Sequence, residues 1–318
     1  GPGDRVALSL QNNPQFAIAQ YGAWKRRAAI VPLSPMYKET ELAYQLSDSG
    51  AKVWVGLDSI YQTHARTAIA ASPTVQHVLT TSEHSFRGDP AADTADQFLT
   101  TLRSTDPAAA ADHRLRSPDA LNDLAHIVYT SGTTGKPKGA MGLHRHIAFN
   151  ANVFRTWMEL GDGDAVLGMA PLFHITGLVA HLAVSALARI PLLLFHRFSP
   201  NEAISMARRY GATFSVASIT AYIALMNDPA IRDGDGFVLS KCFTGGAAVA
   251  PSITEQFEAL TGCYIHNTYG LTEVNSPSHS VPYGTRAPVH KETGALSIGV
   301  PIPNCEARIV DIADPGRE

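Results

Sequence analysis

Cysteine is scarce in this 318-residue sequence, which contains only Cys242, Cys263 and Cys305. The three are widely spaced and odd in number, so they make neither a disulfide framework nor a paired zinc motif. We therefore expect a reducing compartment and a cytoplasmic location.

Long uninterrupted apolar runs are also lacking. The longest apolar stretch, residues 178–194, contains His181, Arg189 and Pro191, and no signal-peptide pattern opens the chain. We interpret this stretch as a buried helix followed by a strand. The sequence thus predicts no integral membrane segment.

Neither sign of charge is in large excess. The sequence has 25 Lys and Arg against 28 Asp and Glu, a formal net charge of −3. The basic residues are scattered, which argues against a nucleic-acid partner held through its phosphates. With 45% hydrophobic residues, the chain can bury one large core or two fused ones, as is typical of a soluble α/β enzyme.

The segment Tyr129–Gly139, YTSGTTGKPKG, carries the strongest chemical signal, with three Gly, one Ser, three Thr and two Lys. Glycine lets the backbone approach a ligand closely, hydroxyls donate to phosphate oxygens, and Lys136 and Lys138 add positive charge. A strand-like segment at 124–128 precedes it and a helix-like one begins near His144, the strand–loop–helix context in which phosphate loops occur. We therefore predict a site for a nucleoside triphosphate.

This segment is not a Walker A loop, because Gly132 and Gly135 are too close together and Pro137 follows Lys136. A flexible surface turn has a similar composition and is the structural alternative.

The order of predicted elements favours a doubly wound α/β fold. Strands are predicted at 6–10, 29–33, 52–55, 124–128, 165–169, 192–195, 213–217, 241–243 and 263–266, and helices at 14–27, 39–47, 177–188, 201–210 and 251–260. Residues 82–122 are predicted to be a surface excursion with one helix near 96–103. Because ligands bind at the carboxyl ends of such strands, we expect Tyr129, Gly245 and Tyr269 to share one cleft.

Five segments, in order along the chain, resemble motifs of the adenylate-forming superfamily, which contains acyl-CoA synthetases, amino-acid-activating domains and beetle luciferases. YTSGTTGKPKG resembles the signature loop, PLFHITG (171–177) the acyl-pocket segment, and FTGGAAVA (243–250) the adenine-side loop. NTYGLTE (267–273) is similar to the most diagnostic motif, and SIGVPIPN (297–304) to the segment that leads into a small β-barrel.

The resemblance implies the large N-terminal domain of such an enzyme, with stacked, mostly parallel sheets flanked by helices. Residues 1–285 would form the acyl- and ATP-binding core, shortened at its N-terminus, and 286–318 would begin the β-barrel. The C-terminal domain, with its catalytic Lys, would be missing. We therefore expect a fragment with impaired turnover; a stand-alone nucleotide- or acyl-binding module is the alternative.

The resemblance also assigns roles to residues. The residues that would contact ATP are Thr130, Ser131, Gly132, Thr133, Thr134, Gly135, Lys136, Gly245, Gly246, Ala247, Asn267, Thr268, Tyr269 and Gly270. Those expected to act in catalysis are Lys138, His174, Thr272 and Glu273, and Thr134 and Glu273 would hold Mg²⁺. Those expected to contact the acid are His174, Gly177, Ala217, Thr220, Ala221, Tyr222, Gly246 and Leu271.

Several of these residues also suit a purely structural role. A Thr-Glu pair at Thr272 and Glu273 fits the first turn of a helix, and Tyr269, predicted to stack on adenine, could be a core residue. His174 takes the place of an Asp that binds the substrate ammonium in amino-acid-activating relatives. An uncharged acyl tail is therefore expected, although a lone His is often a hydrogen-bonded core residue.

The implied reaction activates a carboxylic acid, most simply a fatty acid, with ATP and Mg²⁺, and then transfers the acyl group to the thiol of CoA. No protein nucleophile is needed. Transfer to a carrier-protein thiol remains open, as do the chain length of the acid and a homodimeric assembly.

Overall fold

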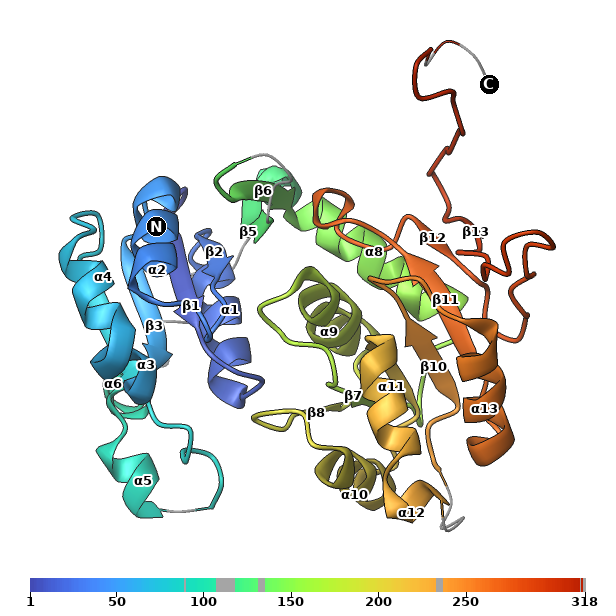
Figure 1. Cartoon of the computed structure of the whole chain (residues 1–318). Coiled ribbons are helices and arrows are strands. Elements are labelled where there is room, and N and C mark those ends of the chain that lie inside the picture. The colour runs from blue at the N-terminus through green and yellow to red at the C-terminus, as the bar shows by residue number, and fades with distance from the viewer. Residues whose placement is uncertain (89, 107–117, 131–134, 233–236, 315, 317–318) are drawn as a thin grey trace.

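Two mostly parallel β-sheets lie side by side and are flanked by helices (Figure 1). The computed structural model describes residues 1–88, 90–106, 118–130, 135–232, 237–314 and 316. Four residues of the predicted phosphate loop, Ser131, Gly132, Thr133 and Thr134, lie outside the described residues.

The first sheet has six strands in the order β4-β3-β1-β2-β5-β6. Its strands are β1 (Arg5–Ser9), β2 (Ala29–Pro32), β3 (Val53–Leu57), β4 (His77–Thr81), β5 (Leu124–Thr130) and β6 (Lys138–Leu143). Strands β1 to β5 pair in parallel, whereas β6 is antiparallel to β5 and forms the edge. Short runs of Val, Ile, Leu and Ala suit strands that are buried on both faces.

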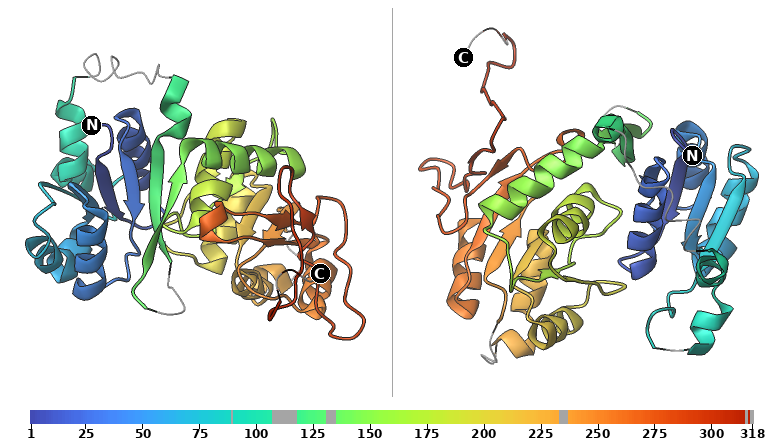
Figure 2. Two further views of the ribbon diagram at one scale, coloured as in Figure 1. Left: turned by 90° about the horizontal axis from the view of Figure 1, so that it is seen from above. Right: turned by 180° about the vertical axis from the view of Figure 1, so that it is seen from behind.

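The second sheet has seven strands in the order β13-β12-β11-β10-β9-β7-β8. Its strands are β7 (Val166–Leu167), β8 (Leu192–Leu193), β9 (Phe214–Ala217), β10 (Lys241–Thr244), β11 (Ile265–Tyr269), β12 (His279–Ser280) and β13 (Val300–Pro301). The last two strands are antiparallel, and the chain beyond them projects away from the body (Figure 2).

Helices connect these strands, and several end at glycines such as Gly50 and Gly211, whose positive φ angles an L residue rarely adopts. The helices of the first half are α1 (Pro14–Lys25), α2 (Glu39–Ser49), α3 (Asp58–Ile60), η1 (Tyr61–Ala65), α4 (Arg66–Ala70), α5 (Pro90–Ala95), α6 (Gln97–Ser104) and η2 (Pro118–Asn122). Those of the second half are α8 (His144–Trp157), η3 (Gly177–Ala183), α9 (Val184–Ala188), α10 (Pro200–Tyr210), α11 (Ile219–Met226), α12 (Pro229–Arg232), α13 (Pro251–Thr261) and η4 (Thr272–Val274).

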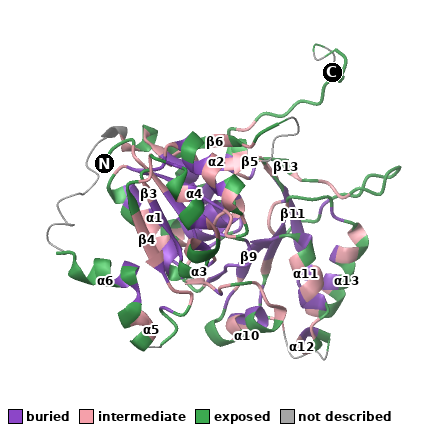
Figure 3. Cartoon of the chain, turned by 60° about the vertical axis from the view of Figure 1, so that its left-hand side comes forward, coloured by how far each residue is buried: buried purple, intermediate pink, exposed green. Residues whose placement is uncertain are grey.

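One helix, formed by η3 and α9, lies between the two sheets. All seven residues of η3 are buried, and its five hydrophobic side chains belong to a core that reaches from β1 to β10. Figure 3 shows that buried residues concentrate in the strands and the inner faces of the helices. From the first half, the Tyr21 hydroxyl donates to the Leu182 carbonyl at 3.2 Å. The helix starts at Gly177, where a Cβ would collide with the backbone of Pro171. Only glycine at this position lets the start of the helix pack so closely against the loop that precedes it.

Asn12 joins the two halves through three buried hydrogen bonds. Its amide nitrogen donates to the carbonyls of Gly168 and Ala170, both at 2.9 Å, and its Oδ1 accepts from the Leu172 backbone N–H at 2.8 Å. A single side chain thus satisfies three backbone groups of the loop that follows β7.

The predicted doubly wound order is confirmed, with ends that differ by a few residues. The predicted strand–loop–helix context is wrong in one respect, because β6 intervenes and the phosphate segment closes an antiparallel hairpin before α8 begins at His144. Strand β4 and helices α4, α5, α11 and α12 are further elements that the sequence reading did not contain. Within the described residues, no helix is long and apolar enough to cross a membrane.

We predict that Asn12→Ala lowers the free energy of unfolding by about 3 kcal/mol, because two buried carbonyls and one N–H lose their partner. Urea unfolding monitored by circular dichroism measures this. Asn152→Ala, at an exposed position of α8, is the matched control and should change stability by less than about 0.5 kcal/mol. Equal losses in the two variants would contradict the role of Asn12.

Candidate nucleotide and acid site

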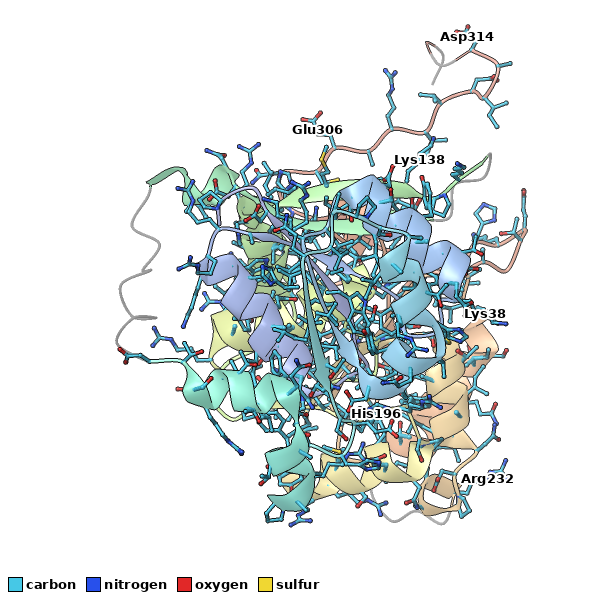
Figure 4. All side chains as sticks on the ribbon, turned by 90° about the vertical axis from the view of Figure 1, so that its left-hand side faces the viewer. Lys38, Lys138, His196, Arg232, Glu306 and Asp314 are labelled. Atoms are coloured by element: carbon cyan, nitrogen blue, oxygen red, sulfur yellow. The ribbon has the colours of Figure 1, made fainter. Side chains whose placement is uncertain are left out.

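The β5–β6 hairpin carries the described part of the phosphate segment. Thr130 is paired with Lys138 and Tyr129 with Gly139 in its antiparallel register. Gly135, Lys136 and Lys138 are exposed, and Lys138 lies at the rim of the molecule (Figure 4). Viewed from above, the hairpin lies between the two halves of the chain (Figure 2). Cations are therefore presented at the boundary between the sheets.

A buried histidine supports the base of this hairpin. His126 on β5 is opposite Gly142 on β6, where any side chain would collide with the imidazole ring. Burial, with smaller contributions from His146 and His144, lowers the pKa of His126 from 6.5 to about 4. The ring is therefore neutral at pH 7.

The turn η4 meets the same hairpin, although 130 residues or so separate them in sequence. Strand β6 contacts η4, and a Cβ at Gly142 would lie 2.8 Å from Oδ1 of Asn275, the residue that ends the turn. The amide of Asn150 on α8 donates to the Val274 carbonyl at 2.9 Å. Thr272 is half-buried and Glu273 is exposed. Two of the predicted catalytic residues thus lie on a turn that packs beside the strand of Lys138.

The ends of β10 and β11 form the next part of the site. The strands pair Thr244 with Asn267, so the loop at Gly245 and Gly246 lies beside the end of β11. A Cβ at Gly245 would lie 2.6 Å from the Thr268 carbonyl, and Gly246 has φ +85° with open space around its Cα. Tyr269, 42% exposed, ends β11. The glycines leave room for close approach of a planar group to an accessible aromatic ring.

Two residues predicted to contact the nucleotide use their side chains for hydrogen bonds to backbone carbonyls of the protein. The Asn267 amide donates to the Ser297 carbonyl and the Thr268 hydroxyl to the His279 carbonyl, each at 3.0 Å. Both residues are buried, whereas Gly270 and Ala247 are respectively half-buried and exposed. A Cβ at Gly270 would lie 2.8 Å from the Ser276 hydroxyl, so this glycine allows the chain to fold back on itself.

The residues predicted to contact the acid differ in how far they are exposed to solvent. Thr220 and Leu271 are exposed, Ala221 is half-buried, and Gly177 and Ala217 are buried. His174 is exposed, its Nδ1 accepts from the Thr176 N–H at 3.3 Å, and desolvation by the surrounding protein lowers its pKa. An uncharged imidazole therefore stands beside the Gly177 turn.

Tyr222 does not fit the predicted pocket. Its side chain is fully buried, its hydroxyl donates to the carbonyls of Ser215 and Phe243, and its ring packs edge-on against Phe257. These contacts identify it as part of the second hydrophobic core. The sequence reading missed α11, whose helical spacing points Tyr222 inward while Thr220 faces solvent.

Sequence reasoning also missed Tyr44 and Asp48 on α2, which contact the hairpin. The Tyr44 hydroxyl donates to the Pro137 carbonyl at 2.8 Å, and the Tyr129 hydroxyl donates to Asp48 Oδ2 at 2.6 Å. The two residues are four apart, the spacing of one helix face, and this is the only signal in the sequence that could have linked them.

Among the described residues, no group of three or more His, Cys, Asp or Glu side chains could hold a metal ion. The three cysteines are free thiols, as their spacing predicts. A resident metal cage is therefore not part of the described site.

The family model described as AMP-binding enzyme matches residues 1–317. This chain belongs to the AMP-binding enzyme family.

Curated relatives extend the match. The chain is 29% identical over 325 residues to a long-chain-fatty-acid–CoA ligase of Bacillus subtilis (strain 168), covering 96% of this chain and 56% of that protein. It is 30% identical over 334 residues to a long-chain-fatty-acid–CoA ligase of Yersinia pestis, covering 97% and 57%. The chain thus spans little more than half the length of these relatives.

Solved structures share the fold. The anthranilate CoA ligase AuaEII in complex with anthranoyl-AMP superposes with a TM-score of 0.83 at 21% identity, over 98% of this chain and 57% of that one. ATP-bound MatB from Rhodopseudomonas palustris gives a TM-score of 0.77 at 25% identity, over 98% and 57%. The architecture is that of the N-terminal part of acyl-CoA ligases.

We predict that stability falls as the pH drops from about 6.5 toward 4, and that His126 causes about 3 kcal/mol of this fall. The unfolded chain binds a proton near pH 6.5 that the folded chain excludes until about pH 4, so stability is full above this window and lost below it. The unfolding midpoint of His126→Phe should depend less on pH across this range than that of wild type. His84→Phe, at an exposed histidine, should keep the wild-type slope. Parallel curves for all three proteins would contradict the assignment.

Proposed function

We propose that this chain is the ATP- and acid-binding part of an enzyme that activates a hydrophobic carboxylic acid, most simply a fatty acid. The acid would become an acyl-adenylate, and the acyl group would then pass to the thiol of CoA. Membership of the AMP-binding family and similarity to proteins named long-chain-fatty-acid–CoA ligases support the proposal.

The contact between β6 and η4 is the observation that carries the proposal. It brings the strand that begins with Lys138 beside the turn that presents Thr272 and Glu273. We assign a cation from β6 and a hydroxyl and a carboxylate from η4 to one site, the combination that a triphosphate with a metal ion requires. A surface turn of the same composition would need no such partner.

We assign the adenine to the loop at Gly245, Gly246 and Ala247 and to the exposed face of Tyr269, since aromatic faces stack well on bases. The phosphates would be held by the hairpin, including Thr130, Gly135 and Lys138, and by the Thr272 hydroxyl. Residues 131–134 belong to the same proposed loop but lie outside the described residues.

The residues present suit Mg²⁺ brought in with the nucleotide. Glu273 is exposed and has no hydrogen bond or ion pair with another described residue, so its carboxylate is available as a hard oxygen ligand. Mg²⁺ in nucleotide enzymes commonly uses one or two carboxylates together with phosphate oxygens, in keeping with the lack of a larger acidic cluster in the described chain. When bound, the ion would neutralise charge on the phosphates.

In the first step, a carboxylate oxygen of the acid attacks the α-phosphorus of ATP, and the bond to pyrophosphate breaks. Lys138 would neutralise charge that builds on the departing pyrophosphate, and Thr272 would donate to an α-phosphoryl oxygen. In the second step, the sulfur of CoA attacks the acyl carbon and AMP leaves. No covalent protein intermediate is required, so the thiols of Cys242 and Cys263 have no part in it.

The acid would lie near His174, with Thr220, Ala221, Gly246 and Leu271 as further contacts. The neutral imidazole of His174 offers no anion to a substrate ammonium. Residues 286–318 carry β13, which pairs with β12 at the edge of the second sheet, and we propose that they lead into a barrel-like subdomain.

We predict that Glu273→Gln in the complete protein weakens Mg²⁺-dependent adenylation at least tenfold while leaving acid binding within about twofold, because only the metal loses a ligand. ATP–pyrophosphate exchange measured across a Mg²⁺ titration tests this. Glu255→Gln, on the exposed side of α13, is the control. Coincident Mg²⁺ curves for Glu273→Gln and wild type would make Glu273 a purely structural residue of the turn.

We predict that hydrophobic acids support ATP–pyrophosphate exchange by the complete protein and that amino acids do not. Burying an ammonium without an anion costs several kcal/mol, on the order of a thousandfold in affinity. A panel of octanoate, palmitate, benzoate, malonate and the common amino acids decides the question. Exchange stimulated best by an amino acid would overturn the proposed substrate class, and a preference for malonate would require a cation in the acid pocket.

A further inference from the structure

Helix α2 contacts the phosphate hairpin from the side opposite to η4, and nothing in the proposed chemistry accounts for these contacts. Tyr44 and Asp48 on this helix are four residues apart and therefore share one face, and they contact the loop end of the hairpin at Pro137 and Tyr129. Asp48 is exposed and Tyr44 is half-buried. Neither residue is needed to complete the hydrophobic core.

Tyr44 makes two different contacts with the hairpin. Its hydroxyl donates to the Pro137 carbonyl at 2.8 Å, and the Lys136 ammonium lies 5.4 Å from the centre of its ring. The first contact fixes the backbone between the two lysines, and the second is a cation–π interaction that favours one position of the Lys136 ammonium beside the ring.

Tyr129 and Asp48 supply the second attachment. The Tyr129 hydroxyl donates to Asp48 Oδ2 at 2.6 Å, and the rings of Tyr129 and Tyr44 meet edge-to-face at 6.2 Å. Burial and the neighbouring carboxylate raise the pKa of Tyr129 well above its usual value, so the hydroxyl keeps the proton that it donates. One face of α2 therefore holds the hairpin at Tyr129 on β5 and at Pro137, just before β6.

The two lysines beside Pro137 are in different environments. Lys136 faces Tyr44, whereas Lys138 begins β6 and is exposed, with no hydrogen bond or ion pair from its ammonium to a described residue. The Lys136 ammonium thus lies near an aromatic ring, whereas the Lys138 ammonium has no partner among the described residues. Of these two lysines, Lys138 is the one whose ammonium has no described partner, so it is the better candidate to bind a phosphate.

We propose that Tyr44, Asp48 and Tyr129 are positioning residues that anchor the phosphate hairpin to α2, and that Lys136 belongs to this anchor, leaving Lys138 as the phosphate-binding lysine. The nucleotide part of this inference rests on the proposed function. Correct placement matters because a displacement of about 1 Å at a reacting group can reduce the rate on the order of a hundredfold.

Limited trypsin digestion of this chain tests the anchor without any assay of activity. Trypsin cuts after Lys138 but not after Lys136, because Pro137 follows it. Mass spectrometry of the fragments gives the rate of cleavage between Lys138 and Gly139. We expect Tyr44→Phe, which keeps the ring, to be cut about fivefold faster than wild type, as the loss of one hydrogen bond implies. Tyr44→Leu should be cut faster still.

Tyr210→Leu is the matched control, because Tyr210 is also a partly exposed tyrosine in a cation–π contact, with Arg209, but lies on α10. Its cleavage after Lys138 should equal that of wild type. Thermal unfolding is measured in parallel, so that a variant with general unfolding is recognised, and Tyr44→Phe then carries the test. Equal cleavage of Tyr44→Phe and wild type would overturn the anchor.

A double-mutant cycle on ATP affinity separates the two lysines. If Lys136 acts through Tyr44, Lys136→Met should weaken ATP binding about three- to fivefold in wild type but have almost no further effect in Tyr44→Leu. Lys138→Met should weaken binding at least tenfold in both backgrounds. An equal loss from Lys136→Met in both backgrounds would make Lys136 a direct phosphate ligand and overturn its place in the anchor. If wild type binds no ATP, the proposed function fails, while the trypsin result still decides whether the anchor exists.

Discussion

Burial of one helix between two sheets is the constraint on which the rest of the molecule depends. The helix formed by η3 and α9 contacts α8 and β9 on one side and receives a hydrogen bond from Tyr21 of the first half on the other. It is buried along the whole of η3, so neither sheet can shift without exposing it. The phosphate hairpin belongs to the first sheet and the Thr272 turn to the second. Packing of this core therefore brings the hairpin and the turn together, and the three hydrogen bonds of Asn12 strengthen the connection between the sheets.

The alternation of strands and helices could be predicted because each buried parallel strand is a short apolar run bounded by turn-forming residues. Gly50, for example, ends α2 in the left-handed conformation, as its place after an amphipathic stretch indicates. Strand β6, KGAMGL, was missed because two glycines and the lack of any β-branched residue give it little strand propensity, and pairing with β5 overrides that weakness. Helix α11 was missed because its apolar run resembles a pocket wall, and Tyr222 was misassigned with it.

The candidate site could be predicted only in part for a related reason. Motif residues such as Lys138, Glu273 and Tyr269 can be recognised from the composition and order of their motifs, and all three are exposed in the structure. The sequence could not indicate which elements hold them, since Tyr44 and Asp48 lie more than 80 residues from the hairpin that they contact. Likewise, Asn267 and Thr268 stand inside a motif yet use their side chains for structural hydrogen bonds. A motif therefore identifies the chemistry, and long-range packing identifies which member of the motif can perform it.

The link between Asn150 and the Val274 carbonyl closes a ring of attachments. Strand β6 runs directly into α8, α8 grips η4 through Asn150, and η4 returns to β6 at Gly142 and Asn275. The three elements β6, α8 and η4 are thus connected in a closed arrangement, in which each element is joined to the other two. The turn that presents Glu273 is therefore held both by the strand that begins with Lys138 and by the helix that follows this strand.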